Sequence, residues 1–79
     1  MIGAGIHPDD LLIVDRSLEP RDKNVVIAVV NGEMTLKRIR IKNKNITLEP
    51  ENENYLPQQI AQDMEFEVWG VVTNVVHTL

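Results

Sequence analysis

An Asn-Gly pair directly follows a continuous apolar run, and this arrangement restricts the fold more than any other part of the sequence. Residues 25–30 read Val-Val-Ile-Ala-Val-Val, and Asn31 and Gly32 come next without a spacer. Asn-Gly is the pair that best tolerates positive φ at both centres of a tight hairpin turn. We therefore predict that residues 25–30 form a strand that pairs antiparallel with residues 33–41.

Three further segments have the pattern of strands. Residues 11–14 and 46–48 are short apolar runs, whereas residues 65–77 begin by alternating and become almost continuous in valine, with Gly70 where the strand can bend. Valine, isoleucine and threonine supply 22 of the 79 residues and alanine only three, which favours strands over helices. The sequence therefore predicts an all-β protein.

The segment 49–63 joins two of these predicted strands. It contains two prolines and several acidic residues, which is typical of a long irregular loop. We expect Tyr55 and Leu56 to anchor this loop to the core, and residues 60–64 to form a single helical turn.

The chain has 79 residues and a mass of 9.0 kDa, which is enough for one small domain spanning residues 1–79. It contains no cysteine, so a disulfide and a thiol nucleophile are excluded. The formal net charge of −4 argues against nucleic-acid binding, which depends on cationic neutralisation of phosphates.

No apolar run reaches the ~18 residues that span a bilayer, and Asp9 and Asp10 stand where a signal peptide needs basic residues. We expect a soluble, cytoplasmic protein without membrane contact.

Lys37 is the residue whose position most suggests catalysis. Two-residue alternation along the predicted third strand places it on the same face as Ile39 and Ile41. Burial among apolar side chains penalises the charged form of an amine, and a general base must be neutral to accept a proton. The residues alone leave a second interpretation open, in which a bulge after Leu36 lets the lysine reach solvent at a strand edge.

Basic residues are concentrated in one predicted hairpin, which contains five of the eight in the chain. One interpretation is a small cationic patch that binds DNA or an acidic protein surface. The other is an ordinary solvated surface. These residues are Lys37, Arg38, Arg40, Lys42 and Lys44.

The remaining candidates have structural interpretations that we prefer. Asp9, Asp10 and Asp15 lie beside a predicted strand, where acidic residues usually cap turns, so we expect no metal there. His7 and His77 are far apart in the sequence with no evident third ligand, and we expect both at the surface.

The two aromatic residues of the last predicted strand are also candidates. Phe66 and Trp69 are expected in the core, because a role in stacking on bases requires basic neighbours that they lack in the sequence.

Taken in order, several segments of the chain resemble the LexA/UmuD family of self-cleaving SOS-response proteins. The matching segments are Met1–Ile6, Asp10–Asp15, Val26–Ala28, Asn31–Arg38, Leu48–Asn52 and Trp69–Val72. They cover nearly the whole chain. The resemblance implies the C-terminal peptidase domain of the family, an all-β fold of small meander sheets in a partly open, barrel-like β-clip.

The resemblance assigns a catalytic role to Lys37. In the stretch Thr35–Arg38 it matches the general-base lysine of the family's Ser-Lys dyad, which performs acyl transfer on a peptide bond of the protein's own N-terminal arm. The family's nucleophilic serine stands immediately before the methionine that matches Met1, and Ser17 matches no catalytic position. We therefore expect the 79-residue chain, truncated relative to the family domain, to be inactive as a peptidase.

A second departure from the family pattern lies in the loop before residues 25–30. Lys23 and Asn24 occupy the positions where the family usually has a Gly-Asp turn. The sequence therefore leaves the geometry of this loop open.

The ending Gly70–His77 is more similar to UmuD than to LexA or phage repressors. The resemblance implies a homodimeric accessory subunit of an error-prone translesion DNA polymerase, which also meets a recombinase filament and needs no cofactor. One alternative is the dimerisation and autocleavage domain of a LexA- or phage-type repressor. Another is a stand-alone β interaction module, in which the surroundings of Lys37 are accidental.

Overall fold

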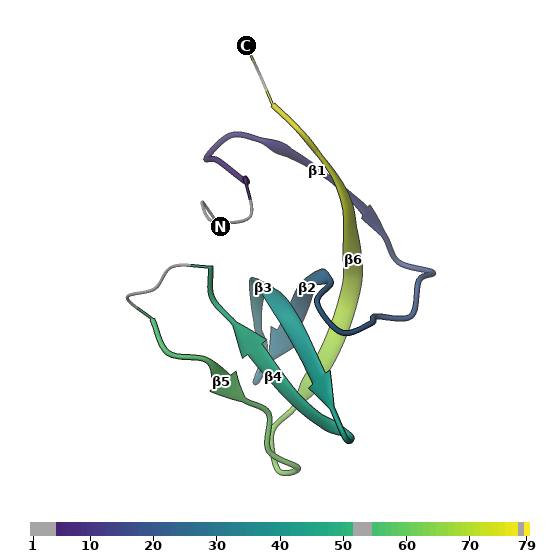
Figure 1. Cartoon of the computed structure of the whole chain (residues 1–79), viewed down its shortest axis with the longest axis vertical. Coiled ribbons are helices and arrows are strands. Elements are labelled where there is room, and N and C mark those ends of the chain that lie inside the picture. The colour runs from purple at the N-terminus through teal and green to yellow at the C-terminus, as the bar shows by residue number, and fades with distance from the viewer. Residues whose placement is uncertain (1–4, 52–54, 78) are drawn as a thin grey trace.

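The computed structural model describes residues 5–51, 55–77 and 79, and within them every regular element is a β-strand. Six strands form one antiparallel sheet in the order β1-β6-β2-β3-β4-β5 (Figure 1). Their bounds are Leu11–Asp15 (β1), Val25–Val30 (β2), Glu33–Lys42 (β3), Asn45–Glu49 (β4), Gln58–Gln59 (β5) and Phe66–Val76 (β6). The prediction of an all-β protein is confirmed. Within the described ranges there is no helix of a length and hydropathy suited to crossing a membrane.

β2 and β3 form the hairpin that the Asn-Gly pair predicts. The two turn residues, Asn31 and Gly32, have positive φ values of 49° and 84°. β3 and β4 are joined by a second tight turn, in which Asn43 and Lys44 also have positive φ. These short turns let β2, β3 and β4 follow one another as a meander.

The core lies on one face of this meander. Alternate residues of β2 are buried, and Val26 and Ala28 are fully enclosed. Ile39 of β3 pairs with Leu48 of β4, and both of these side chains are fully buried as well. Val71 of β6 completes the buried cluster. The sheet curls around these side chains while its edge strands, β1 and β5, remain unpaired with each other, so the sheet stays open (Figure 1).

The segment that follows β4 differs in part from the prediction. It contains the short strand β5, and at 60–64 it forms only a turn, closed by a hydrogen bond from the Met64 N–H to the Ala61 carbonyl at 3.1 Å. The expectation that Tyr55 and Leu56 anchor this segment is wrong, because they are 66% and 90% exposed. Ile60 and Met64 pack against the core instead. They stand where the chain turns back towards β6.

β6 holds the two halves of the sheet together. Its first half pairs with β2 and its second half pairs with β1. Each ladder contains one register shift, and these shifts leave Trp69 and Thr73 without a partner residue on the opposite strand. Extra residues of this kind bend a strand and increase its twist. The bend predicted near Gly70 therefore exists, and two bulges produce it.

Gly70 lies between the two bulges, next to the end of the ladder that β6 forms with β1. A Cβ atom at this position would overlap Cγ1 of Val14. Glycine is required here by the close approach of a neighbouring side chain.

We expect Gly70→Ala to lower the free energy of unfolding by about 1–3 kcal/mol, because a methyl group would be forced into occupied space. Urea denaturation of Gly70→Ala, Val14→Ala and the double variant measures the effect. Val14→Ala should relieve the clash, so the double variant should be more stable than the sum of the single changes implies. Additive effects would show that the contact is not the cause.

The second prediction concerns Lys23, which has a positive φ of 75° although it is not glycine. The left-handed region costs an ordinary residue roughly 1–2 kcal/mol, and glycine adopts it freely. Lys23→Gly should therefore raise the free energy of unfolding by about 0.5–1 kcal/mol, after allowance for the greater freedom of unfolded glycine. Lys42→Gly, in the extended backbone of β3, is the matched control and should destabilise. Stabilisation in both variants would exclude backbone strain as the explanation.

Candidate active site

Lys37 lies in the middle of β3, on the face of the sheet that carries the core. It pairs directly with Val26 of β2, which is fully buried, and Ile39 follows it on the same face. β3 pairs with β2 and β4 without any register shift. The face predicted for Lys37 is confirmed, and the alternative with a bulge after Leu36 is wrong.

The neighbours of Lys37 by strand register are mainly apolar. The residue is half-buried. Its neighbours on the same face are Thr35, which pairs with Ala28, and the apolar residues Val26 and Ile39. Among the described residues, no carboxylate forms an ion pair with Lys37. A hydroxyl group that approaches on the core face would therefore meet no carboxylate paired with this lysine among the described residues.

The arginine beside Lys37 connects β3 to two loops. Arg38 points away from the core, donates a hydrogen bond from Nη1 to the Lys23 carbonyl at 2.7 Å, and forms an ion pair with Glu51. The Ile39 backbone continues the connection, because its carbonyl accepts from the Lys23 N–H and its N–H donates to the Asn24 carbonyl, both at 2.8 Å. The loop that departs from the family's Gly-Asp pattern is therefore held on β3, with Lys23 in the left-handed conformation.

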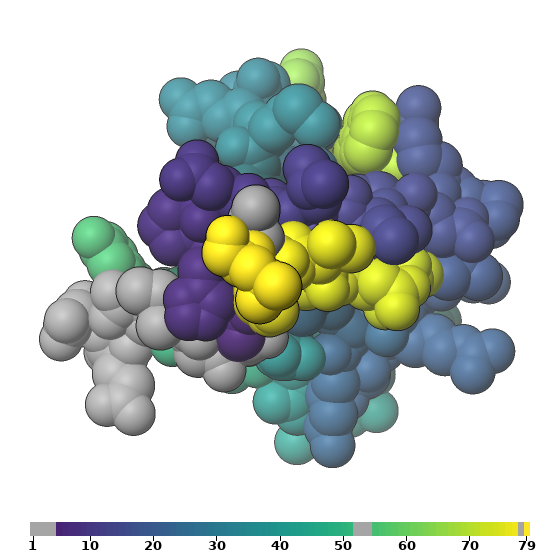
Figure 2. Space-filling view, turned by 90° about the horizontal axis from the view of Figure 1, so that it is seen from above, coloured from purple at the N-terminus to yellow at the C-terminus, as the bar shows by residue number. Residues whose placement is uncertain are grey.

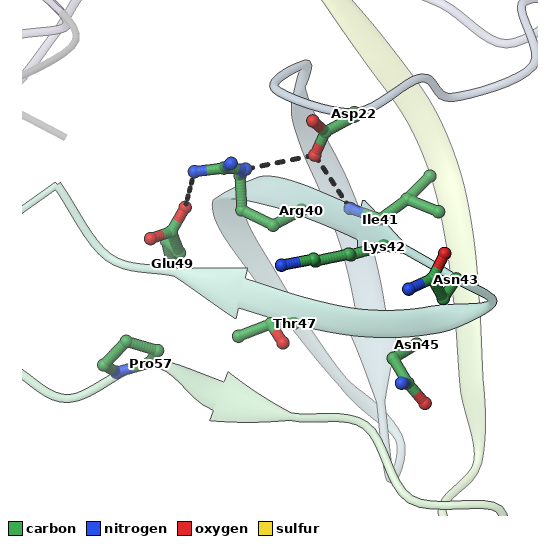
Figure 3. A pocket seen from close by; sticks show the side chains of 9 residues that line it. All are labelled: Asp22, Arg40, Ile41, Lys42, Asn43, Asn45, Thr47, Glu49 and Pro57. Atoms are coloured by element: carbon green, nitrogen blue, oxygen red, sulfur yellow. Dashed lines mark hydrogen bonds and ion pairs between the residues drawn. The ribbon is translucent and has the colours of Figure 1, made fainter.

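Two arginines of the basic hairpin are paired with acidic residues. Arg40 forms ion pairs with Asp22 at 3.0 Å and with Glu49 at 3.1 Å (Figure 3). Asp22 also accepts a hydrogen bond from the Ile41 N–H at 2.8 Å, and this bond, with the one from Arg40, holds its pKa below the ordinary value. Both bonds favour the ionised carboxylate.

A hollow of about 480 Å³ lies beside this network. Carboxylates and cations line it together, and the side chains of Lys42 and Thr47 are among those that line it (Figure 3). Two of the five basic residues, Arg38 and Arg40, are neutralised by acidic partners. This pairing favours the solvated-surface interpretation over a DNA-binding patch, because phosphate contacts need cations that are not already paired.

Ser17, the only serine of the sequence, is used in a turn. Its hydroxyl donates a hydrogen bond to Asp15 at 2.6 Å, and its backbone N–H donates to the same oxygen at 2.8 Å. These bonds hold the pKa of Asp15 below its ordinary value. Ser17 is exposed in the connection between β1 and β2, so Asp15 is a cap, as predicted.

The two aromatic residues of β6 have different surroundings. Phe66 packs against the core, as predicted. Trp69 is half-buried at its bulge, where the Arg16 guanidinium lies 4.2 Å from its ring centroid and donates to its backbone carbonyl at 2.9 Å. The expectation that Trp69 lacks a basic neighbour is wrong, because Arg16 is remote only in sequence.

The expectation that His7 and His77 lie at the surface is confirmed, because both are exposed. Although they are far apart in the sequence, their rings meet edge to face with centroids 5.4 Å apart, and His77 pairs with Asp10. In Figure 2 the segment before β1 lies directly beside the end of β6. Asp10 acts as a cap, as predicted, and accepts from the His7 N–H. Within the described residues, no group of three or more His, Asp or Glu side chains is arranged to hold a metal ion.

Part of the predicted site lies outside the described residues. Met1–Ala4, which include the methionine that would follow the family's serine, and Asn52 of the matching segment after β4 belong to this part. The structure therefore places the lysine of the predicted dyad and leaves its partner as a prediction.

Comparison with known proteins gives a consistent assignment. Residues 1–73 match the family model described as Peptidase S24-like. The chain is 37% identical over 78 residues to the LexA repressor of Bordetella pertussis, covering 99% of this chain and 36% of that protein. It is 38% identical over 76 residues to LexA repressor 1 of Xanthomonas oryzae pv. oryzae, covering 96% and 38%.

A third relative has a different name. The protein ImpA of Salmonella typhimurium is 35% identical over 78 residues, covering 94% of this chain and 50% of ImpA. The chain thus spans between about a third and a half of the length of these curated relatives.

Proposed function

The chain belongs to the Peptidase S24-like family of LexA/UmuD-type proteins, and on that premise we propose that Lys37 is the general base of a Ser-Lys dyad in a UmuD-like domain. The observation that carries the proposal is the position of Lys37, half-buried on the core face opposite Val26 and next to Ile39. A lysine at this position can present its amine to a hydroxyl group on the core face, which is the geometry that a general base needs.

The reaction is acyl transfer. The Lys37 amine takes the proton of a serine hydroxyl, the oxygen attacks the carbonyl carbon of a peptide bond, and the amine of the leaving segment departs with a proton. Water then attacks the acyl-serine and restores the hydroxyl. Ser17 is bound to Asp15 in its turn, so the nucleophile in this proposal belongs to polypeptide on the N-terminal side of Met1.

The finer role that we propose is that of UmuD. By resemblance to the family, a UmuD-like protein is a homodimeric accessory subunit of an error-prone translesion polymerase in the SOS response, and a recombinase filament is a further partner. The ending Gly70–His77 supports this choice. The acidic net charge of −4 suits contacts with protein rather than with DNA.

A second candidate is the autocleavage and dimerisation domain of a repressor. It is favoured by the relatives, because two of those described above are named LexA repressors. The reading frame upstream of the codon for Met1 separates the two candidates. A short arm supports the UmuD-like role, and a helical DNA-binding module supports the repressor.

The dyad is tested by adding the missing partner. We expect an N-terminal extension that contains an Ala-Gly bond and ends in serine before Met1 to cleave itself, and the 79-residue chain to leave the same peptide intact. In the extended protein, Lys37→Ala should slow cleavage at least about a hundredfold, because general-base catalysis contributes this much. Mass spectrometry over time measures the product.

Lys42→Ala is the matched control, since Lys42 is an exposed lysine of the same strand, and it should cleave at the normal rate. Circular dichroism shows whether Lys37→Ala is folded. Cleavage by folded Lys37→Ala at the normal rate would overturn the proposed role, and cleavage by the 79-residue chain would overturn its predicted inactivity.

We also propose that the protein is a homodimer that uses the end of the sheet formed by β1 and β6. Leu11, Ile13 and Val76 share one face there by alternation and register, and they are 67%, 50% and 45% exposed. A row of exposed apolar side chains next to an edge strand is the type of surface that a second copy covers.

Sedimentation equilibrium tests the dimer. We expect dimers at tens of micromolar, and Ile13→Asp should weaken association at least about tenfold, because it would place a charge in an apolar contact. Met34→Asp is the control, since Met34 is 59% exposed on β3 and lies outside this row. A wild-type protein that stays monomeric, or equal effects of both substitutions, would contradict the proposed interface.

A further inference from the structure

The turn between β2 and β3 contains a chemically labile pair of residues. Of the seven asparagines in the sequence, only Asn31 precedes a glycine. Asparagine is labile because the next backbone nitrogen can attack its side-chain amide carbon, and glycine obstructs this attack least because it has no side chain. Both residues of the turn are exposed, and open space surrounds the position that a Cβ atom would occupy at Gly32. Solvent can therefore reach the pair.

The Asn31 side chain is held by a residue that is remote in the sequence. Its Oδ1 accepts a hydrogen bond from the Glu65 N–H at 3.1 Å, and the Asn31 N–H donates to the Glu65 carbonyl at 2.8 Å. Glu65 lies immediately before β6, so the two bonds fasten the turn to the start of that strand. Turning the amide carbon towards the nitrogen of Gly32 moves Oδ1, so the bond from Glu65 must open first.

We propose that Asn31 is a site of spontaneous covalent modification, in which the nitrogen of Gly32 displaces the side-chain amide as ammonia, and that the bonds to Glu65 slow this reaction in the folded chain. Water is the co-reactant. The proposal does not depend on the catalytic role of Lys37.

The reaction has two steps. A bond forms between the Gly32 nitrogen and the Asn31 side-chain carbon while the bond from that carbon to Nδ2 breaks, and the Gly32 N–H proton leaves with Nδ2 as ammonia. Water then opens the cyclic imide. Attack at the side-chain carbon gives aspartate, whereas attack at the backbone carbon gives isoaspartate, in which the main chain runs through the former side chain. Each product has an ionised carboxylate at neutral pH and so one more negative charge than asparagine.

The two products differ in their effect on the hairpin. Aspartate retains the backbone of the turn and an oxygen that can accept from the Glu65 N–H. Isoaspartate lengthens the main chain by one carbon atom between Val30 and Glu33, which are paired across the turn. The length of a hairpin turn sets the register of the strands that it joins. Isoaspartate should therefore loosen the hairpin that carries Lys37.

Storage of the 79-residue chain in neutral solution at physiological temperature tests the site. We expect a slowly growing fraction with one added negative charge on ion-exchange chromatography. Trypsin, which cuts after lysine, releases residues 24–37 as one peptide, and tandem mass spectrometry locates the change within it. Asn24 is the internal control and should remain unchanged, because the β-branched Val25 follows it. Equal modification of both asparagines, or an unchanged Asn31, would overturn the site.

Two comparisons test the restraint by Glu65. In guanidinium chloride, Asn31 should convert at least about tenfold faster than in the folded chain, because two hydrogen bonds no longer have to open. Glu65→Pro removes one donor and should accelerate conversion about threefold, whereas Glu65→Ala retains the N–H and should leave the rate unchanged. Circular dichroism shows whether both variants are folded. Equal rates in the folded and unfolded wild-type chain would overturn the restraint, as would equal rates in the two folded variants.

The effect on the hairpin has its own control. Asn31→Asp has the charge of the modified chain and an unlengthened backbone. The isoaspartate fraction, separated by chromatography, should unfold at a lower denaturant concentration than Asn31→Asp. Equal midpoints would overturn the predicted loosening.

Discussion

The position of β6 between β1 and β2 is the constraint on which the rest of the structure depends. Among the strands that the structure describes, only β6 pairs with both β1 and β2, so these two strands are held together through it. The bulges at Trp69 and Thr73 and the absence of a side chain at Gly70 let the strand turn towards β1 without losing its hydrogen-bonding partners. A chain of 79 residues has too few apolar side chains to build a second core, and this one strand allows it to use a single core.

Most of the sheet could be predicted because the relevant signals are local. Alternation and the Asn-Gly pair place β2 and β3 within a residue of their observed bounds, and counting alternate positions is enough to put Lys37 on the core face. β5 was missed because Gln58 and Gln59 have no apolar pattern, and their pairing with β4 is a consequence of tertiary structure.

Contacts between distant residues could not be predicted. Hydrophobicity suggested Tyr55 and Leu56 as anchors, but the position of the turn before β6 makes Ile60 and Met64 the residues that reach the core. The stacking of Arg16 on Trp69 also joins positions that no pattern in one sequence connects. The same limit applies to the candidate site. Strand periodicity predicts the face of the sheet on which Lys37 lies. The conformation of the loop at Lys23 could not be predicted in this way, because it depends on a positive φ that no sequence pattern indicates.

The two edges of the sheet are unequal, and this inequality bears on how copies of the chain can assemble. β5 presents only two residues along its outer side, whereas β1 presents five. Strand-by-strand growth into a fibre needs a usable edge on each side of every copy. Glu33–Lys37 of β3 also lies beyond the end of the ladder with β4, and Phe66–Gly70 of β6 lies beyond the ladder with β1. The open edges are therefore staggered, and a second copy must match this stagger in order to pair along them.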